Sequence, residues 1–250
     1  MYQRVITFLL IIFVISLASF AKNTYANTAT VGRCFEIYDP YEKLNRKIFA
    51  LNNTLDKTLI RPSVLLYTKV VPAWPQARIN SFFSNLKSPL TFVNNILQGD
   101  FDAAGKTFGR FLFNSTMGIG GLLDWSKACG LENKPQQFDD TLMKFDMPYG
   151  QYIIIPFLGP STTRGVAGKV VDVFIDPIDL TLIVEHKNKL AFEYFLAREF
   201  NLRVQAEENL DLSKQDFLDE YSFIRSSYLQ YLASKNKFCK KEEINYELYN

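Results

Sequence analysis

Histidine is almost absent from this chain: His186 is the only one among 250 residues. It stands among charged residues, where a histidine is usually a solvated surface group rather than a general base. The sequence also lacks the G-x-S-x-G motif of serine hydrolases and the G-x-x-x-x-G-K-[ST] motif of nucleotide-binding loops. We therefore expect a protein that is not an enzyme and uses no cofactor, although paired carboxylates distant in sequence would leave no local motif.

Cysteines are few and far apart. Cys34, Cys129 and Cys239 cannot all pair within one chain, and their spacing fits no metal site. Arg33 precedes Cys34 where a lipoprotein signal has a small residue, and Cys34 lies well beyond the apolar N-terminal run. A lipid anchor at Cys34 is therefore not expected, and a bridge between Cys34 and Cys129 is left open as an alternative.

Excess charge and long apolar runs are also missing. Lys and Arg number 28 and Asp and Glu 26, so the formal charge of +2 gives no field that would attract nucleic acid. Beyond the N-terminal segment no stretch reaches about eighteen apolar residues, the minimum for a helix surrounded by lipid. No sequence unit repeats at a fixed interval, which excludes a solenoid.

The N-terminus has the pattern of a targeting segment. Arg4 precedes an almost unbroken apolar run over residues 5–20. At 1.5 Å per residue this run spans roughly 24 Å, less than the ~30 Å hydrocarbon core, which favours a signal peptide over a retained anchor. We predict a signal peptide in residues 1–26, cut after Ala21 or Ala26, and hence an exported protein.

Aromatic residues are abundant, with 22 Phe and 13 Tyr, and supply more apolar surface than a soluble domain of this size needs. A helix with one apolar face is predicted from Leu44, ending at Arg61-Pro62 because proline disfavours a helical residue before it. Either a protein core or a bilayer interface would bury such a face. The apolar positions of this helix are Leu44, Ile48, Leu51, Leu55 and Leu59.

Further amphipathic helices follow. One carries Ile79, Phe82, Phe83 and Leu86, and beyond an interruption at Pro89 the stripe continues through Leu90, Val93, Ile96 and Leu97, which predicts a kinked pair. Asp100 is expected to cap a helix whose apolar face is Phe101, Ala104, Phe108, Phe111 and Leu112. Residues 149–160 predict an extended loop or short edge hairpin, residues 190–232 predict helix, and residues 235–250 a polar tail.

Three glycines, Gly118, Gly120 and Gly121, break the Phe-rich helical pattern. Each glycine inside a helix costs about 1 kcal/mol relative to alanine, so this cluster indicates a deliberate break or a close backbone approach. Close crossing of two helices is one explanation, and a role in a functional path is the other.

A series of motifs in a fixed order resembles one family. Residues 39–49 fit the pattern D-P-x-E-x-x-N-R-x-x-F. The later motifs are Arg61-Pro62, Val71-Pro72, Asn85-Leu86-Lys87-Ser88-Pro89, Asn94-Asn95-Ile96-Leu97-Gln98-Gly99, residues 113–124, residues 149–164, Asp176-Pro177, and residues 225–230. Over residues 39–231 the chain resembles the MlaA proteins, also called VacJ.

The resemblance implies a mostly α-helical protein, with amphipathic helices in a ring or disc lying within the outer membrane. It implies a component of a retrograde transport system that extracts mislocalised phospholipids from the outer leaflet through an amphipathic channel. The implied partners are phospholipid, a periplasmic lipid-carrier protein and a trimeric porin, with no nucleic acid. The implied location is the periplasmic side of the outer membrane.

Matching motif positions gives two sets of candidate residues. The lipid-path candidates are Asn45, Arg46, Asn52, Asn53, Gly118, Gly120, Gly121, Tyr149, Gly150 and Tyr152. The membrane-facing candidates are Leu44, Ile48, Leu51, Leu55, Phe82, Phe83, Phe108 and Phe111.

The chain departs from the family pattern in three respects: the lipoprotein signal is missing, Asp146 stands where glycine is commoner, and Gly165 stands where an acidic residue is usual. Two other functions are kept as alternatives. One is a porin-associated structural protein of the envelope without a lipid path, and the other is a phospholipase.

Overall fold

Helices form most of the structure. It is a computed structural model that describes residues 39–210 and 219–235, and in the first range it describes side chains up to residue 207. The predicted signal peptide, Cys34, Cys239 and the tail beyond residue 235 lie outside the described residues. The helices are α2 (Glu42–Leu55), a π-helical turn η1 (Asp56–Ile60), α3 (Arg61–Val70), α4 (Ala73–Leu86), α5 (Ser88–Leu97), α6 (Phe101–Thr116), α7 (Trp125–Ala128), α8 (Phe138–Lys144), α9 (Thr163–Ile175), α10 (Pro177–Val184), α11 (Asn188–Leu210) and α12 (Glu220–Lys235). Among the described residues no helix combines the length and apolar character needed to cross a membrane.

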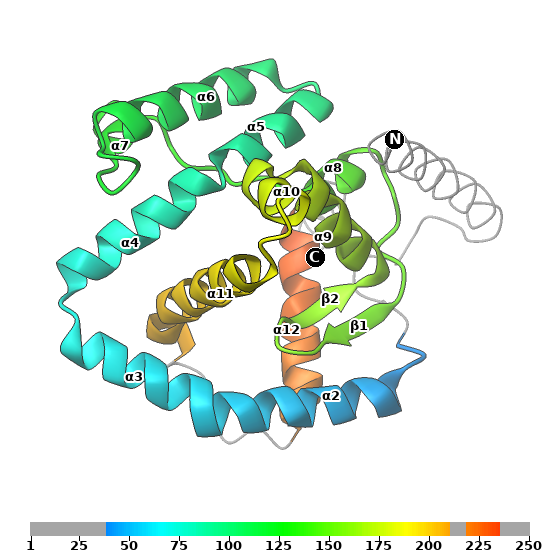
Figure 1. The fold of residues 1–250 in the computed structure, drawn as a ribbon. Coiled ribbons are helices and arrows are strands. Elements are labelled where there is room, and N and C mark those ends of the chain that lie inside the picture. The colour runs from blue at the N-terminus through cyan, green and yellow to red at the C-terminus, as the bar shows by residue number, and fades with distance from the viewer. Residues whose placement is uncertain (1–38, 211–218, 236–250) are drawn as a thin grey trace, which may run out of the picture. The chain divides into compact units, whose positions relative to one another are not determined.

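The prediction of a mostly helical fold with a short hairpin is confirmed. In Figure 1, α2 and α3 run along one edge, α4 along the next, and α5 and α6 along the opposite edge, while α11 passes between them. The two strands, β1 (Tyr152–Ile155) and β2 (Gly159–Thr162), pair antiparallel, with Tyr152 opposite Thr162 and Ile155 opposite Gly159.

The predicted end of the first helix at Arg61-Pro62 is wrong. The helical path continues from α2 through η1 into α3, and Pro62 stands in the first turn of α3. The amide of Arg61 donates to the carbonyl of Asp56, five residues back rather than four. This wider turn makes room for the proline ring, which in a regular helix would clash with the carbonyl four residues before it.

Two other local predictions are confirmed. The chain breaks between α4 and α5 at Lys87, and Pro89 occupies the first turn of α5, where its missing N–H is not needed. Asp100 caps α6, because its carboxylate accepts a hydrogen bond from the amide of Ala103 at 3.0 Å.

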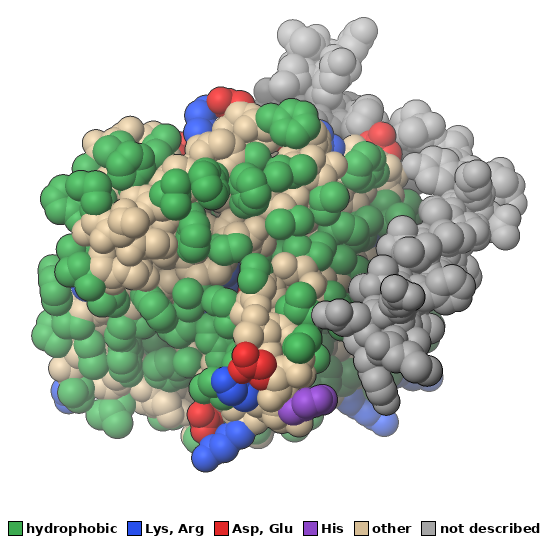
Figure 2. All heavy atoms as spheres, turned by 45° about the horizontal axis from the view of Figure 1, so that its top comes forward, with side chains coloured by type: hydrophobic (Ala, Val, Ile, Leu, Met, Phe, Trp, Pro, Cys, Tyr) green, Lys and Arg blue, Asp and Glu red, His purple; other side chains and the backbone are tan. Residues whose placement is uncertain are grey.

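Polar side chains fill much of the interior, and apolar side chains cover much of the outside. The buried polar set includes Asn45, Asn85, Ser88, Thr91, Asn94, Asn95, Arg110, Asn114, Thr141, Arg164 and Asp176. On α6 the buried residues are Ala104, Arg110 and Asn114, while Phe101, Phe108 and Leu112 of the predicted apolar face are exposed. Figure 2 shows hydrophobic side chains spread over most of one face, with few charges among them. Buried polar groups need partners, so the interior is held by hydrogen bonds as much as by apolar packing.

Candidate functional site

An open cavity of about 700 Å³ lies among α4, α5, α9, α10, α11 and the segment around residues 133–137. Apolar side chains, among them Phe83, Leu90 and Val173, form part of its wall. The charged side chains of the lining are Lys87, Lys169, Asp172, Asp176, Asp179, Arg198 and Glu199. The cavity therefore has the mixed lining needed for a ligand with a polar end and an apolar body.

The carboxylates of this cavity have partners within the fold. Asp172 accepts a hydrogen bond from the amide of Phe138 at 2.9 Å, and burial raises the pKa of Asp172 to about 6. Asp176 caps α10 by accepting from the amide of Ile178 at 2.9 Å, and burial raises its pKa as well. Asp179 and Glu199 both lie 3.4 Å from the guanidinium of Arg198.

Lys87 differs from these groups. Its side chain has no hydrogen bond or ion pair with any other residue in the described part of the chain. Burial lowers the pKa of Lys87, and the positive charge of Arg198 lowers it further. An ammonium group in partly desolvated surroundings, with no directly bonded carboxylate, is an obvious contact for an anion.

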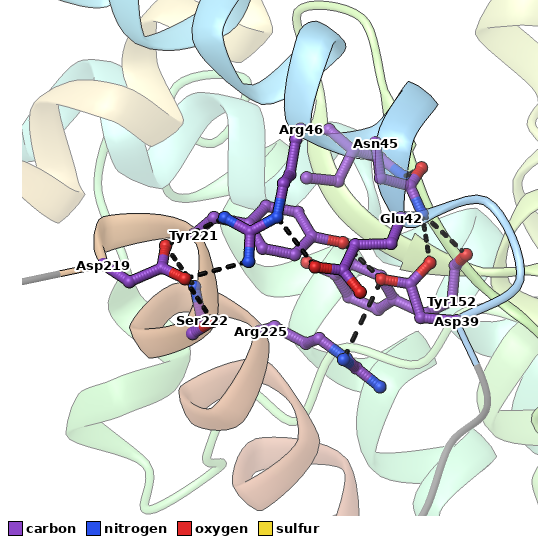
Figure 3. Close-up of polar contacts among 10 residues, drawn as sticks. Asp39, Glu42, Asn45, Arg46, Tyr152, Asp219, Tyr221, Ser222 and Arg225 are labelled. Carbon is purple, nitrogen blue, oxygen red and sulfur yellow. Dashed lines mark hydrogen bonds and ion pairs between the residues drawn. The ribbon is translucent and has the colours of Figure 1, made fainter.

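A second polar cluster joins α2 to the start of α12 (Figure 3). The Arg46 guanidinium donates to both carboxylate oxygens of Asp219, at 3.1 and 2.9 Å, and to Glu42 at 2.8 Å. It also lies over the ring of Tyr221, 4.4 Å from the ring centroid. The hydrogen bonds with Asp219 raise the pKa of Arg46, and those with Arg46 hold the pKa of Asp219 well below its usual range. A paired, stacked arginine of this kind fixes position and orientation between two helices.

Asn45 and Asn52 attach α2 to the outer edge of strand β1. The Asn45 side chain donates to the carbonyl of Tyr152 at 3.1 Å and accepts from the amide of Ile154 at 3.0 Å. Asn52, two turns along the same helix, donates to the carbonyl of Ile155 at 3.0 Å and accepts from the amide of Phe157 at 2.9 Å. Since Asn45 also donates to Asp39 at 2.8 Å, helix, strand and N-terminal segment meet at one amide.

None of the ten predicted lipid-path residues lines the cavity. Asn53 donates to Glu220 at 2.7 Å on the surface. Tyr149 donates to the carbonyl of Leu232 at 3.0 Å, with Arg164 lying 4.1 Å over its ring, and Tyr152 is fully buried. Gly150, with a φ of +73°, leaves room for Thr163. For these residues a role in the lipid path stays a prediction, and the contacts seen here join elements to one another.

The glycine cluster forms the turn after α6. Gly118 is buried, and a Cβ there would lie 2.2 Å from the carbonyl oxygen of Leu123. Gly121 has a φ of +96° and packs against Asn85 of α4, whose Cβ would lie 2.5 Å from an added Cβ. Gly120, with a φ of +69°, faces open space. Close approach of neighbouring atoms therefore explains Gly118 and Gly121, and the positive φ explains Gly120.

The membrane-facing candidates divide into two groups. Leu44, Leu51 and Phe108 are exposed. Ile48, Leu55, Phe82, Phe83 and Phe111 are half-buried, and Phe83 also lines the cavity.

Sequence reasoning missed the charged lining of the cavity, in particular Lys87, Asp172 and Arg198. The available signal was a charge on otherwise apolar stretches, but Lys87 comes from the break between α4 and α5, Asp172 from α9 and Arg198 from α11, which are far apart in sequence. In the described part of the chain no three His, Cys, Asp or Glu side chains are grouped to hold a metal ion.

Comparison with known proteins decides the family. Residues 37–235 match the model of the MlaA lipoprotein family. The chain belongs to this family. A solved structure described as the structural basis for maintenance of bacterial outer membrane lipid asymmetry is similar, with a TM-score of 0.66, 29% identity, and coverage of 80% of this chain and 100% of the other.

Relatives within the family support the same assignment. The Escherichia coli protein named intermembrane phospholipid transport system lipoprotein MlaA is 30% identical over 217 residues, 83% of each chain. A Haemophilus influenzae protein of the same name is 29% identical over 160 residues, 62% of this chain and 64% of the other. The Rickettsia prowazekii protein RP093 is 40% identical over 148 residues. That match spans 59% of RP093, a little over half of its length.

Proposed function

We propose that this protein is the outer-membrane component of an intermembrane retrograde phospholipid transport system. In this role it extracts mislocalised phospholipids from the outer leaflet and passes them to a periplasmic carrier, which maintains lipid asymmetry. The observation that carries the proposal is the combination of an amphipathic cavity, a polar interior and an apolar exterior in a chain of the MlaA family. The names of its Escherichia coli and Haemophilus influenzae relatives support the same role.

The distribution of side chains fits a protein that lies in a membrane on its periplasmic side. Exposed leucine, phenylalanine and tryptophan side chains provide apolar contact with lipid. A phospholipid in the cavity would keep its headgroup among the buried charges and its acyl chains beside apolar wall residues. A trimeric porin and a periplasmic lipid carrier are the partners we propose for this activity.

The protein acts without catalysis in this proposal. His186 is exposed at the end of α10, where a solvated surface role accounts for it. Direction of transport then comes from partner proteins, because the sequence has no phosphate-binding loop motif.

A complementation experiment tests the proposal and separates transport from a structural role. We expect deletion of the gene to raise the phospholipid content of the outer leaflet, and the wild-type gene to restore it. Val173→Trp should weaken restoration, because Val173 lines the cavity and a larger side chain would narrow it. Val170→Trp is the matched control, since Val170 lies on the same helix, is exposed and lies outside the cavity lining.

Two outcomes contradict the proposal. An unchanged outer leaflet after deletion would refute transport. Full restoration by a normally folded Val173→Trp protein would favour a structural envelope role without a lipid path. Retained lipid asymmetry after His186→Ala would argue against a histidine-dependent phospholipase.

A further inference from the structure

Lys87 occupies the break between α4 and α5, and its side chain lines the cavity. Phe83, one helical turn before it, and Leu90, one turn after it, line the same cavity. Ser84 and Thr91 line it as well, so the wall on either side of Lys87 combines apolar and hydroxyl side chains and supplies no ionic partner. A charged group in such a setting gains from an ionic partner, because these neighbours supply none.

The other charges of the cavity do not neutralise Lys87 by direct contact. Asp172 and Asp176 accept hydrogen bonds from backbone amides, and Arg198 lies between Asp179 and Glu199. Lys87 has no hydrogen bond or ion pair within the described residues, although Glu199, Asp176 and Asp172 act on it electrostatically. The contact positions around the ammonium are thus open to an anionic ligand.

The charge balance of the lining restricts what that ligand can be. Four carboxylates and three cationic side chains line the cavity, so a ligand with negative charge alone meets a lining that is already slightly negative. A phosphodiester next to an amine is neutral as a whole and presents both signs. Such a ligand matches a lysine that has carboxylates nearby.

We propose that the Lys87 ammonium binds the phosphate of a phospholipid headgroup in this cavity, and that Asp172 and Glu199 favour headgroups that also carry an amine. This inference rests on the proposed function and names the substrate class, zwitterionic phospholipids. Phe83, Leu90 and Val173 contact the less polar part of the same molecule. Burial lowers the pKa of Lys87, and the negative charge of a bound phosphate offsets this lowering.

Binding of defined lipids to the purified full-length protein tests the inference. Detergent micelles doped with phosphatidylethanolamine, micelles doped with phosphatidylglycerol, and inorganic phosphate are the three probes. We expect the protein to bind phosphatidylethanolamine more tightly than phosphatidylglycerol, and Lys87→Gln to weaken that binding about tenfold or more, the loss typical of a charged hydrogen bond. Lys87→Arg should retain most of the affinity, and Lys144→Gln, an exposed lysine outside the cavity lining, should not change it.

Three other results would each contradict one part of this inference. Equal phosphatidylethanolamine binding by wild type and a normally folded Lys87→Gln protein would overturn the role of Lys87. Tighter binding of phosphatidylglycerol would overturn the preference for an amine. Binding of inorganic phosphate at millimolar levels, with no binding of either lipid, would assign the site to free phosphate. Complementation distinguishes the two proposals, because a wild-type gene that fails to restore the outer leaflet contradicts the proposed function itself.

Discussion

Asn45 shows what sequence can and cannot reveal about a single residue. Its place on the predicted amphipathic helix was correct, and its motif position marked it as a residue of interest. Its partners were not predictable, because Tyr152 and Ile154 lie more than a hundred residues away in the sequence. Long-range contacts of this kind depend on the tertiary arrangement and leave no periodic pattern in the chain.

Replacing Asn45 by alanine should destabilise the fold. The substitution leaves the carbonyl of Tyr152 and the amide of Ile154 without their partner in a buried place, where Asn45 is 1% exposed. We expect the free energy of unfolding to fall by about 2 to 3 kcal/mol, measured by chemical denaturation. Asn53→Ala, which removes one surface hydrogen bond to Glu220, should cost less than about 0.5 kcal/mol. Equal losses in the two variants would contradict the role given to Asn45.

Asp172 should make stability depend on pH. Burial raises its pKa from 3.8 to about 6, so the folded protein binds this proton more tightly than the unfolded chain does. The stabilisation is present below pH 4 and is lost as the pH rises through about 6. Asp140, Lys169, Lys87 and the amide of Phe138 act on the same carboxylate.

The Asp172→Asn variant lacks this titrating group, so its stability compared with wild type tests the prediction. Relative to wild type, the variant should gain about 2 kcal/mol of stability between pH 4 and pH 7, because the ionised buried carboxylate is no longer present. Unfolding curves at several pH values give the difference directly. A difference that does not vary with pH would contradict the raised pKa.

At the scale of elements, local signals were read correctly where the cause was local. The Asp100 cap and the break near Pro89 depend only on neighbouring residues, and both occur as expected. The prediction that the helix ends at Arg61-Pro62 was wrong because a π-helical turn accommodates Pro62. No nearby residue type predicts such a turn. The cavity was missed for the same reason as the partners of Asn45, since its charges come together from distant segments, among them α9, α11 and the break after α4.

Arg46 should control how firmly the start of α12 is held against α2. Lysine at this position keeps the charge but loses the two parallel hydrogen bonds to Asp219 and the stacking on Tyr221. We expect faster hydrogen exchange in residues 220–224 of Arg46→Lys, with little change in global stability because the pair is exposed to solvent. Lys106→Ala, which breaks an exposed pair with Asp102 inside α6, is the control and should leave that exchange unchanged. Unaltered exchange in Arg46→Lys would show that other contacts hold α12.

For the molecule as a whole, composition predicted an excess of apolar surface but not where it would lie. The Phe-rich helices suited a protein core and a bilayer equally, and the structure places Phe101, Phe108 and Leu112 on the outside. Arg110 and Asn114 of the same helix are buried instead. Periodicity identifies an apolar face and does not identify what covers it.

This surface should make membrane attachment resistant to salt. Apolar contact is not screened by ions, whereas attachment through charges is weakened steeply at about 1 M salt. We expect washed membranes to keep the protein at high salt and to release it in mild detergent, as followed by immunoblotting of the fractions. Introducing charge at exposed apolar positions, as in Leu66→Glu with Phe192→Glu, should shift the protein toward the salt-soluble fraction. Release of the wild-type protein by salt alone would contradict an apolar attachment.

The outer edge of β1 has a further consequence for how the protein behaves while it folds. A two-stranded hairpin normally leaves a row of free backbone groups to which a strand from another chain can add. Here the side-chain amides of Asn45 and Asn52 occupy the groups at Tyr152, Ile154, Ile155 and Phe157. Docking of α2 therefore also closes the β1 edge of the hairpin as a template for aggregation, in a chain whose many exposed apolar side chains already make self-association a hazard.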